Sequence, residues 1–126
     1  MVKGKIGIVV IVVLAILVTA VLTNAAAIQV SQVVYITRSK ACGCSAQSVK
    51  AADAAIAQVF TGPRQALLKR IDYDTDRQAA VPYIGEFRLI QLPALLVLDS
   101  QNHLLWSAIG SVDPNKLEEK MKGFGG

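Results

Sequence analysis

The apolar residues of this chain are concentrated at its N-terminus. Residues 6–22 are almost purely aliphatic, and no charged residue occurs between Ile6 and Thr37. This run is near the lower length limit for crossing a hydrocarbon core of roughly 30 Å, and its apolar continuation to Ile28 would give ample length. Lys3 and Lys5 precede it, so the N-terminus should stay inside. We predict an N-terminal membrane anchor or signal segment over residues 1–27 and one exported domain over residues 28–126.

Two fates of this segment remain open. A retained helix would make a single-pass protein of the cell membrane with an extracytoplasmic domain. Alternatively, Ala25-Ala26-Ala27 is a small-residue cleavage site after a basic start and an apolar run, so the domain would be secreted. We favour the retained anchor because the apolar run is long for a signal peptide.

The exported part alternates between strand-like and helix-like patterns. Runs rich in β-branched and aliphatic residues predict strands, and apolar residues at three- and four-residue spacing predict helices. The predicted strands span residues 29–37, 67–73, 94–98 and 103–109, and the predicted helices span residues 46–60, 74–84 and from Asp113 through Met121. This order predicts an α/β fold in which a mixed sheet is flanked by helices.

Local signals refine some of these elements. Pro82 should interrupt the second helix, which Asp74, Thr75 or Asp76 should cap. Asp113 should cap the last helix, with proline at its first position. The C-terminal Phe124-Gly125-Gly126 should be a frayed tail.

The candidate chemistry lies in Cys42-Gly43-Cys44, which contains the only two cysteines of the chain. The motif follows a predicted strand and begins a predicted helix. Unpaired amide groups and a partial positive charge at a helix N-terminus favour a thiolate. Arg38 and Lys40 lie just upstream, where we expect both to be solvated. The pattern indicates chemistry at sulfur, with Cys42 as the nucleophile.

The charge pattern argues against nucleic acid as a partner. The chain has thirteen Lys and Arg residues and nine Asp and Glu residues. Removing Lys3 and Lys5 leaves eleven basic against nine acidic residues in the exported part, scattered without a basic stripe.

The exported part resembles the thioredoxin family over about residues 29–122. The matching features are the cysteine motif after the first strand, Leu92-Pro93-Ala94 at the start of the third strand, and the Trp106-to-Gly110 strand end before the last helix. The resemblance implies that Pro93 is cis and faces the cysteines. It also implies that Leu92 and Pro93, together with Gly43, contact the substrate.

The motif departs from the family pattern, in which two residues separate the cysteines and tryptophan precedes them. Here one residue separates them and Ala41 precedes them. Matching the first cysteines places Ser45 at the second thiol, whereas matching the second cysteines places Ala41 at the first. The buried acid of many thioredoxins has no counterpart in the first strand, where Tyr35 and Ile36 stand.

The predicted function is that of a membrane-tethered extracytoplasmic thiol-disulfide oxidoreductase or isomerase. Cys42 would attack a substrate disulfide and Cys44 would resolve the mixed disulfide, with Gly43 allowing the tight backbone between them. The small ring of such a disulfide stores strain and favours an oxidant or isomerase over a strong reductant. Partners would be protein thiols or disulfides and a membrane redox protein, and no cofactor is expected.

The alternative function is a binding module or carrier for a soft metal. The thiolates of Cys42 and Cys44 would chelate Cu(I), Hg(II) or an arsenical. A redox-inactive domain that binds a membrane protein is a third interpretation. His103 is interpreted as a surface turn residue. The aspartates at positions 72, 74 and 76 are interpreted as a solvated strand end and helix cap, because a calcium loop would need glycine at Arg77.

Overall fold

The computed structural model describes residues 27–126. The predicted membrane segment over residues 1–27 therefore lies, except for Ala27, outside the described residues. Within the described part, no helix is both long enough and apolar enough to cross a membrane. The domain boundary at Ile28 also stays a prediction.

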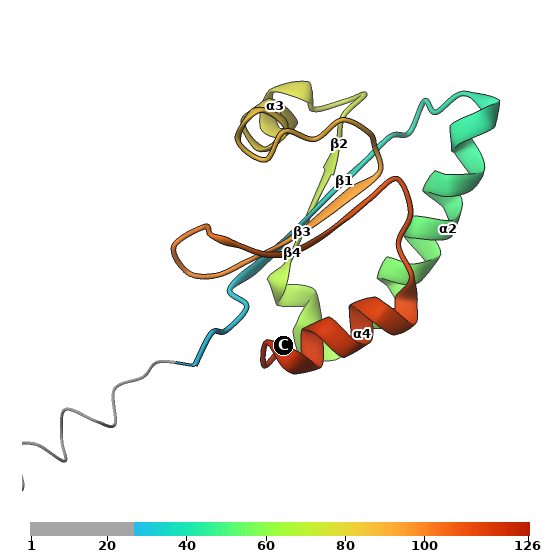
Figure 1. Cartoon of the computed structure of the whole chain (residues 1–126). Helices are drawn as coiled ribbons and strands as arrows, with labels where there is room; N and C mark the ends of the chain where they lie inside the picture. The colour runs from blue at the N-terminus through green and yellow to red at the C-terminus, as the bar shows by residue number, and fades with distance from the viewer. Residues whose placement is uncertain (1–26) are drawn as a thin grey trace, which may run out of the picture.

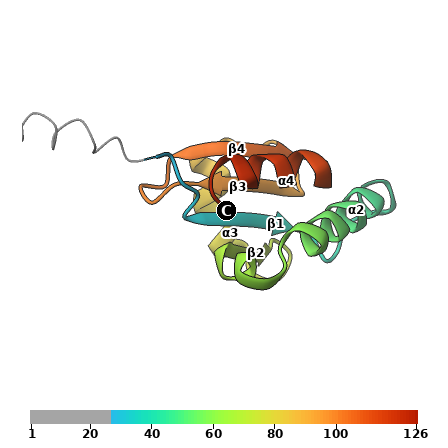
Figure 2. The same ribbon diagram turned by 90° about the horizontal axis from the view of Figure 1, so that it is seen from below.

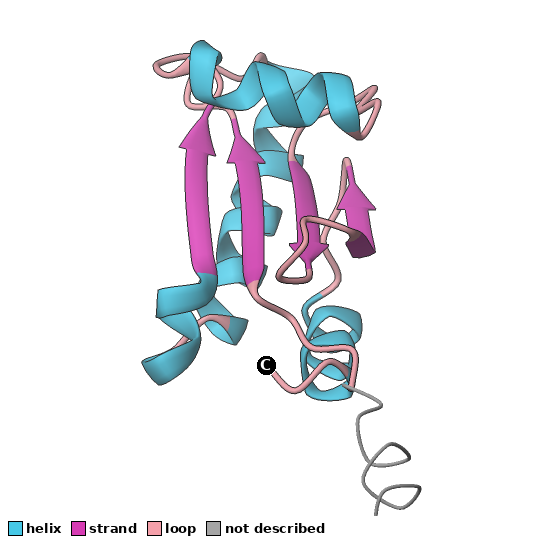
Figure 3. Ribbon diagram, turned by 90° about the vertical axis from the view of Figure 1, so that its left-hand side faces the viewer, coloured by secondary structure: helices cyan, strands magenta, loops and turns pink. Residues whose placement is uncertain are grey.

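Four strands form one mixed sheet (Figure 3). The strands are β1 (Gln32–Thr37), β2 (Leu68–Asp72), β3 (Ala94–Leu98) and β4 (Leu104–Ile109), and they lie in the order β2-β1-β3-β4. β1 is parallel to β2 and antiparallel to β3, and β3 is antiparallel to β4. The four predicted strands are confirmed, with ends that differ by a few residues.

Helices cover both faces of this sheet (Figure 1). They are α2 (Gly43–Val59), α3 (Arg77–Glu86) and α4 (Pro114–Gly123), and a short 3-10 helix, η1 (Gly62–Leu67), precedes β2. The three α-helices were predicted, whereas η1 was not. The predicted α/β class, a mixed sheet flanked by helices, is confirmed for the described residues.

Alternate residues of β1 point into two separate cores. Val33 and Tyr35 pack with α2 and α4 on one face, and Val34 and Ile36 pack with α3 on the other. All four side chains are fully buried. Successive side chains of a strand point to opposite faces, so an uncharged apolar strand suits a sheet that is covered on both sides.

Helix α2 carries the cysteine motif at its N-terminus and extends past the edge of the sheet (Figure 2). Its buried residues share one helical face: Val49, Ala52, Ala55, Ile56 and Val59. The helix begins at Gly43, three residues before the predicted start, so Cys42 is its N-cap and Cys44 lies in its first turn. Between α2 and β2, Gly62 has a φ of 57°. This left-handed conformation favours glycine.

The predicted interruption of the second helix at Pro82 is wrong, because α3 continues through it to Glu86. Proline in a helix interior removes one backbone hydrogen bond and costs about 3 kcal/mol. Packing offsets this cost, since Ala80 is fully buried and Tyr83 and Ile84 pack against the same core. The cap is Asp76, whose carboxylate accepts a hydrogen bond from the Ala79 amide.

The C-terminal tail is docked, so the prediction of a frayed end is wrong. The Val30 amide donates to the Phe124 carbonyl at 3.0 Å, and Phe124 packs against the core. The Gly126 carbonyl accepts a hydrogen bond from Nη2 of Arg64 at 3.0 Å. Upstream, the predicted cap of α4 is confirmed, because Asp113 accepts hydrogen bonds from two helix amides.

Candidate functional site

Cys42 is the N-cap residue of α2, at the end of the loop that leaves β1. Its carbonyl accepts hydrogen bonds from the amides of Ser45 and Ala46, at 2.9 and 2.8 Å. Both cysteines are exposed free thiols. The motif therefore lies where the sequence predicted it, after the first strand and at a helix N-terminus.

The two thiols are in direct contact. Sγ of Cys42 lies 3.1 Å from Sγ of Cys44 and 3.4 Å from Oγ of Ser45. The Ser45 hydroxyl also lies 3.2 Å from the Cys42 carbonyl, to which it donates. The Cys42 sulfur is thus bounded by two groups that can donate a hydrogen bond to it.

These contacts give the two thiols different acidities. The hydrogen bond from the Ser45 side chain, followed by that from Cys44, lowers the pKa of Cys42 to about 7. The hydrogen bond to Cys42 and the charge of its thiolate raise the pKa of Cys44. Because the thiolate is the reactive form, Cys42 is the stronger nucleophile at neutral pH.

Gly43 is exposed as the first residue of α2. A Cβ at this position would contact nothing within 4 Å. The reduced conformation therefore does not require glycine, and the predicted need for it concerns only the oxidised pair.

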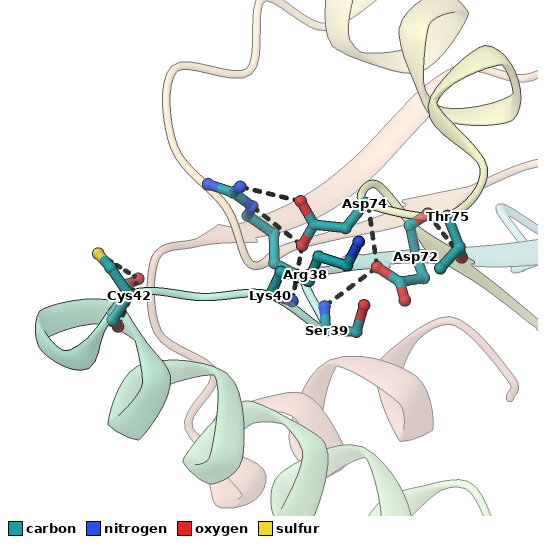
Figure 4. Close-up of polar contacts among 8 residues, drawn as sticks. Arg38, Ser39, Lys40, Cys42, Asp72, Asp74 and Thr75 are labelled. Atoms are coloured by element: carbon teal, nitrogen blue, oxygen red, sulfur yellow. Dashed lines mark hydrogen bonds and ion pairs between the residues drawn. The ribbon is translucent and has the colours of Figure 1, made fainter.

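The loop before the cysteines is held by the end of β2 and the turn that follows it (Figure 4). Asp74 forms an ion pair with Arg38 at 2.9 Å and accepts a hydrogen bond from the Lys40 amide at 2.8 Å. Asp72 accepts a hydrogen bond from the Ser39 amide at 3.1 Å. Only 10% of the Asp74 side chain is exposed. The interpretation of Asp74 as a solvated residue is therefore wrong, whereas the Arg38 side chain keeps 39% of its surface exposed.

A carboxylate that the sequence did not predict contacts the first strand. Asp53, on α2, accepts a hydrogen bond from the buried Tyr35 hydroxyl at 2.7 Å. It also pairs with Arg70 of β2 at 3.0 Å. No acid lies within β1, as predicted, but Asp53 ties this strand to α2 and β2. The sequence could not predict this contact, because Tyr35 and Asp53 are 18 positions apart and lie on different elements, β1 and α2.

The Leu92–Pro93 peptide bond is cis, as the resemblance implied. Pro93 is fully buried, and its carbonyl accepts a hydrogen bond from the Gly110 amide at 2.7 Å. Leu92 is half-buried and reaches the surface. Substrate contact by Leu92 and Pro93 stays a prediction.

An open groove of about 390 Å³ lies beside the cysteine motif. Polar and apolar residues contribute about equally to its lining: Arg38, Ser45, Tyr73, Ile84, Leu89, Ile90, Gln91 and Leu92. Ile90 is 92% exposed, the highest fraction among the large apolar side chains of the described residues. This groove connects the first turn of α2 with the segment before Pro93.

Other predicted residues lie away from this site. His103 is a surface residue of the β3–β4 hairpin, as predicted, and its Nδ1 lies 3.3 Å from a carboxylate oxygen of Asp99. Among the described residues, no three His, Cys, Asp or Glu side chains are grouped closely enough to hold a metal ion. A metal at the cysteines would have only their two sulfurs as ligands from this set.

The sheet order, the cis proline and the motif at the start of α2 define a thioredoxin-like fold. Trxlp from Edwardsiella tarda EIB202, a thioredoxin-like protein, aligns with a TM-score of 0.53 and 20% identity, over 81% of this chain and 91% of its own. StoA from Bacillus subtilis aligns with a TM-score of 0.44 and 10% identity, over 73% of this chain and 84% of its own. The predicted resemblance is confirmed at the level of the fold.

No family model matches the chain. No curated protein matches it either.

Proposed function

We propose that this protein is a thiol-disulfide oxidoreductase or isomerase that acts through Cys42 and Cys44. The contact between the two thiols carries the proposal, because an attacking and a resolving sulfur must meet during exchange. Their opposite pKa shifts divide the roles between them. The thioredoxin-like fold is consistent with this chemistry but does not by itself assign it.

In the proposed cycle, the Cys42 thiolate attacks one sulfur of a substrate disulfide. A bond forms between Cys42 and that sulfur, and the other substrate sulfur leaves as a thiolate with the electron pair of the broken bond. The Cys44 thiolate then attacks Sγ of Cys42 and releases the second substrate thiolate. The substrate gains two electrons, and the protein is left with a Cys42–Cys44 disulfide.

The reverse direction would oxidise a substrate dithiol. A disulfide between residues separated by one position closes a small ring, and strain makes such a bond easier to reduce. The strained ring therefore favours transfer of the disulfide to a substrate dithiol, or isomerisation of substrate disulfides. A membrane redox partner would then renew the site.

We further propose that the site works outside the cytoplasm on a membrane tether. The basis is the sequence alone: the aliphatic run over residues 6–22 and the lysines that precede it. Disulfides form and persist in extracytoplasmic compartments, which suits this chemistry. The substrates would be protein thiols or disulfides lying along the groove between Ser45 and Leu92.

Soft-metal binding is a second candidate, favoured by two exposed thiols within reach of each other. A linear two-coordinate ion needs its sulfurs about 4.6 Å apart, twice a metal–sulfur bond of about 2.3 Å. Sγ of Cys42 and Sγ of Cys44 lie 3.1 Å apart, so they would have to separate. Their contact therefore favours exchange between sulfurs over metal binding.

The test is the reduction potential of the pair in the full chain. The protein is equilibrated with glutathione buffers, alkylated, and its free thiols are counted by mass spectrometry. We expect a reversible two-electron transition between about −180 and −120 mV, the range of an isomerase or a strong oxidant. A transition near −270 mV would indicate a reductant. If no intramolecular disulfide forms and both thiols instead retain a stoichiometric soft ion, metal binding replaces the exchange reaction.

A further inference from the structure

Two side chains contact Sγ of Cys42: the thiol of Cys44 and the hydroxyl of Ser45. The Ser45 hydroxyl lies 3.4 Å from Sγ of Cys42 and 3.2 Å from the Cys42 carbonyl oxygen. Residues three apart on a helix face the same side, which places this hydroxyl against the sulfur. The Ser45 amide also donates to the Cys42 carbonyl at 2.9 Å, which fixes the turn.

A serine hydroxyl has a single proton and can direct it to either of these acceptors. When Cys42 is a neutral thiol, the carbonyl oxygen is the better acceptor, and the hydroxyl donates to it. When Cys42 is a thiolate, the sulfur carries a full charge, and hydrogen bonds to charged acceptors are roughly twice as strong. The hydroxyl should therefore donate to the sulfur, and not to the carbonyl oxygen, once Cys42 is a thiolate.

We propose that Ser45 is a catalytic residue whose hydroxyl donates a hydrogen bond to the Cys42 thiolate, both when Cys42 attacks and when it leaves. This role rests on the proposed exchange function. In the attack, the sulfur lone pair of Cys42 forms the new bond while Ser45 keeps its own proton. In the reverse direction, a substrate thiolate attacks the substrate sulfur of the mixed disulfide on Cys42. A substrate disulfide forms, and Cys42 leaves with the electron pair of the broken bond.

Cys44 does not replace Ser45 in this role. Its thiol also contacts Cys42, but it must lose its proton to resolve the mixed disulfide, and it is then an anion without a proton to donate. Ser45 keeps its proton through every step. The Arg38 charge also acts on Cys42, but this guanidinium is already paired with Asp74.

Ser45 also faces the place where the substrate would lie. Among the residues that line the groove, it is the one contributed by α2. Its side chain is half-buried, whereas Cys42 and Cys44 are exposed. The hydroxyl thus lies between the nucleophile and the groove.

The test measures the rate at which iodoacetamide alkylates Cys42 in the reduced full chain as a function of pH, resolved by site with mass spectrometry. For Ser45→Ala we expect the midpoint of this profile to rise toward that of an ordinary thiol, and the rate at pH 7 to fall by about threefold to tenfold. Ser45→Thr keeps the hydroxyl and should restore the wild-type midpoint. Ser48→Ala, one turn further along the same helix, should leave it unchanged.

The outcomes separate this proposal from the proposed function. A wild-type midpoint in Ser45→Ala, together with a reversible Cys42–Cys44 disulfide, overturns the role of Ser45 and leaves the exchange function intact. An equal shift in Ser48→Ala also overturns it, because the effect would then belong to the helix. An ordinary thiol midpoint in the wild-type chain, with no reversible disulfide, overturns both.

Discussion

The Asp74 carboxylate lies 2.9 Å from Nη2 of Arg38, and this ion pair joins the turn after β2 to the loop before Cys42. The same carboxylate accepts a hydrogen bond from the Lys40 amide. One nearly buried side chain thus holds the loop through a backbone group and a side chain. Because this loop leads directly to the nucleophile, Asp74 links the stability of the fold to the position of Cys42.

Asp74→Asn should destabilise the chain in a way that depends on pH. The Arg38 hydrogen bond, followed by that of the Lys40 amide, lowers the pKa of Asp74. A carboxyl whose pKa is lower in the folded chain stabilises the fold above its unfolded pKa of about 3.9, and this contribution is lost as pH falls through the folded value. Urea unfolding followed by Trp106 fluorescence should therefore show a less stable variant at pH 7 and pH 5. The difference should shrink below pH 4.

Asp76→Asn is the matched control for this experiment. Asp76 caps α3 and makes no ion pair among the described residues, and asparagine caps helices about as well as aspartate. Its stability should follow that of the wild type across the same pH range. A deficit in Asp74→Asn that stays constant down to pH 3 would show that the ion pair is not its cause.

Cys44→Ser should trap mixed disulfides on Cys42. The variant keeps the nucleophile but lacks the resolving thiol, so the intermediate with substrate persists. Cys42→Ser is the control, because it removes the thiol whose pKa the Ser45 hydroxyl lowers and leaves only Cys44, the assigned resolving residue. Non-reducing gels and mass spectrometry should find trapped proteins with Cys44→Ser and few with Cys42→Ser. Equal trapping by both variants would contradict the assigned roles.

Tyr35→Phe should cost about 1–2 kcal/mol of the free energy of unfolding, because it removes a buried hydrogen bond to a carboxylate. Burial of the phenol raises the pKa of Tyr35, so its hydroxyl remains a donor throughout the working pH range. Tyr83→Phe is the control, since the Tyr83 hydroxyl accepts an exposed hydrogen bond from Lys69 and its loss should cost little. Denaturant unfolding measures both variants, and equal losses would refute a special role for the Tyr35–Asp53 contact.

Periodicity predicted most elements of the part of the chain that the structure describes, because burial dominates local preference there. β1 and β3 are buried on both faces and lack charge, and the apolar spacing of α2 matches its buried face. The pattern failed at Pro82, where packing of Tyr83 and Ile84 outweighs the local cost of proline. Helix propensity is a property of proline itself, whereas the continuation of α3 depends on packing against the sheet, which the local sequence does not reveal.

The candidate site was predictable only where its parts are neighbours in sequence. Cys42 and Cys44 are separated by one residue, and this spacing predicted a redox pair. The contact of Ser45 with Cys42 was not predicted, although the two residues are only three positions apart. Asp74 reaches Arg38 across 36 positions because β2 pairs with β1 in parallel, which brings both strand ends to the same edge. Without that register, Asp74 looks like a solvated residue before a helix.

Ile90 should determine how well the site acts on proteins. It is 92% exposed and lines the groove beside Ser45, so a bound protein segment would bury it. Burial of such a side chain contributes about 2 kcal/mol, and Ile90→Ser should lower kcat/KM for a disulfide-containing protein by on the order of tenfold. Glutathione disulfide is largely polar and has little apolar surface to place against Ile90, so its turnover should change little. Val81→Ser is the control, because Val81 is 52% exposed on α3 outside the groove. A similar loss on both substrates would place the effect of Ile90 at the cysteines, whereas no loss on the protein would mean that substrates do not bind along this groove.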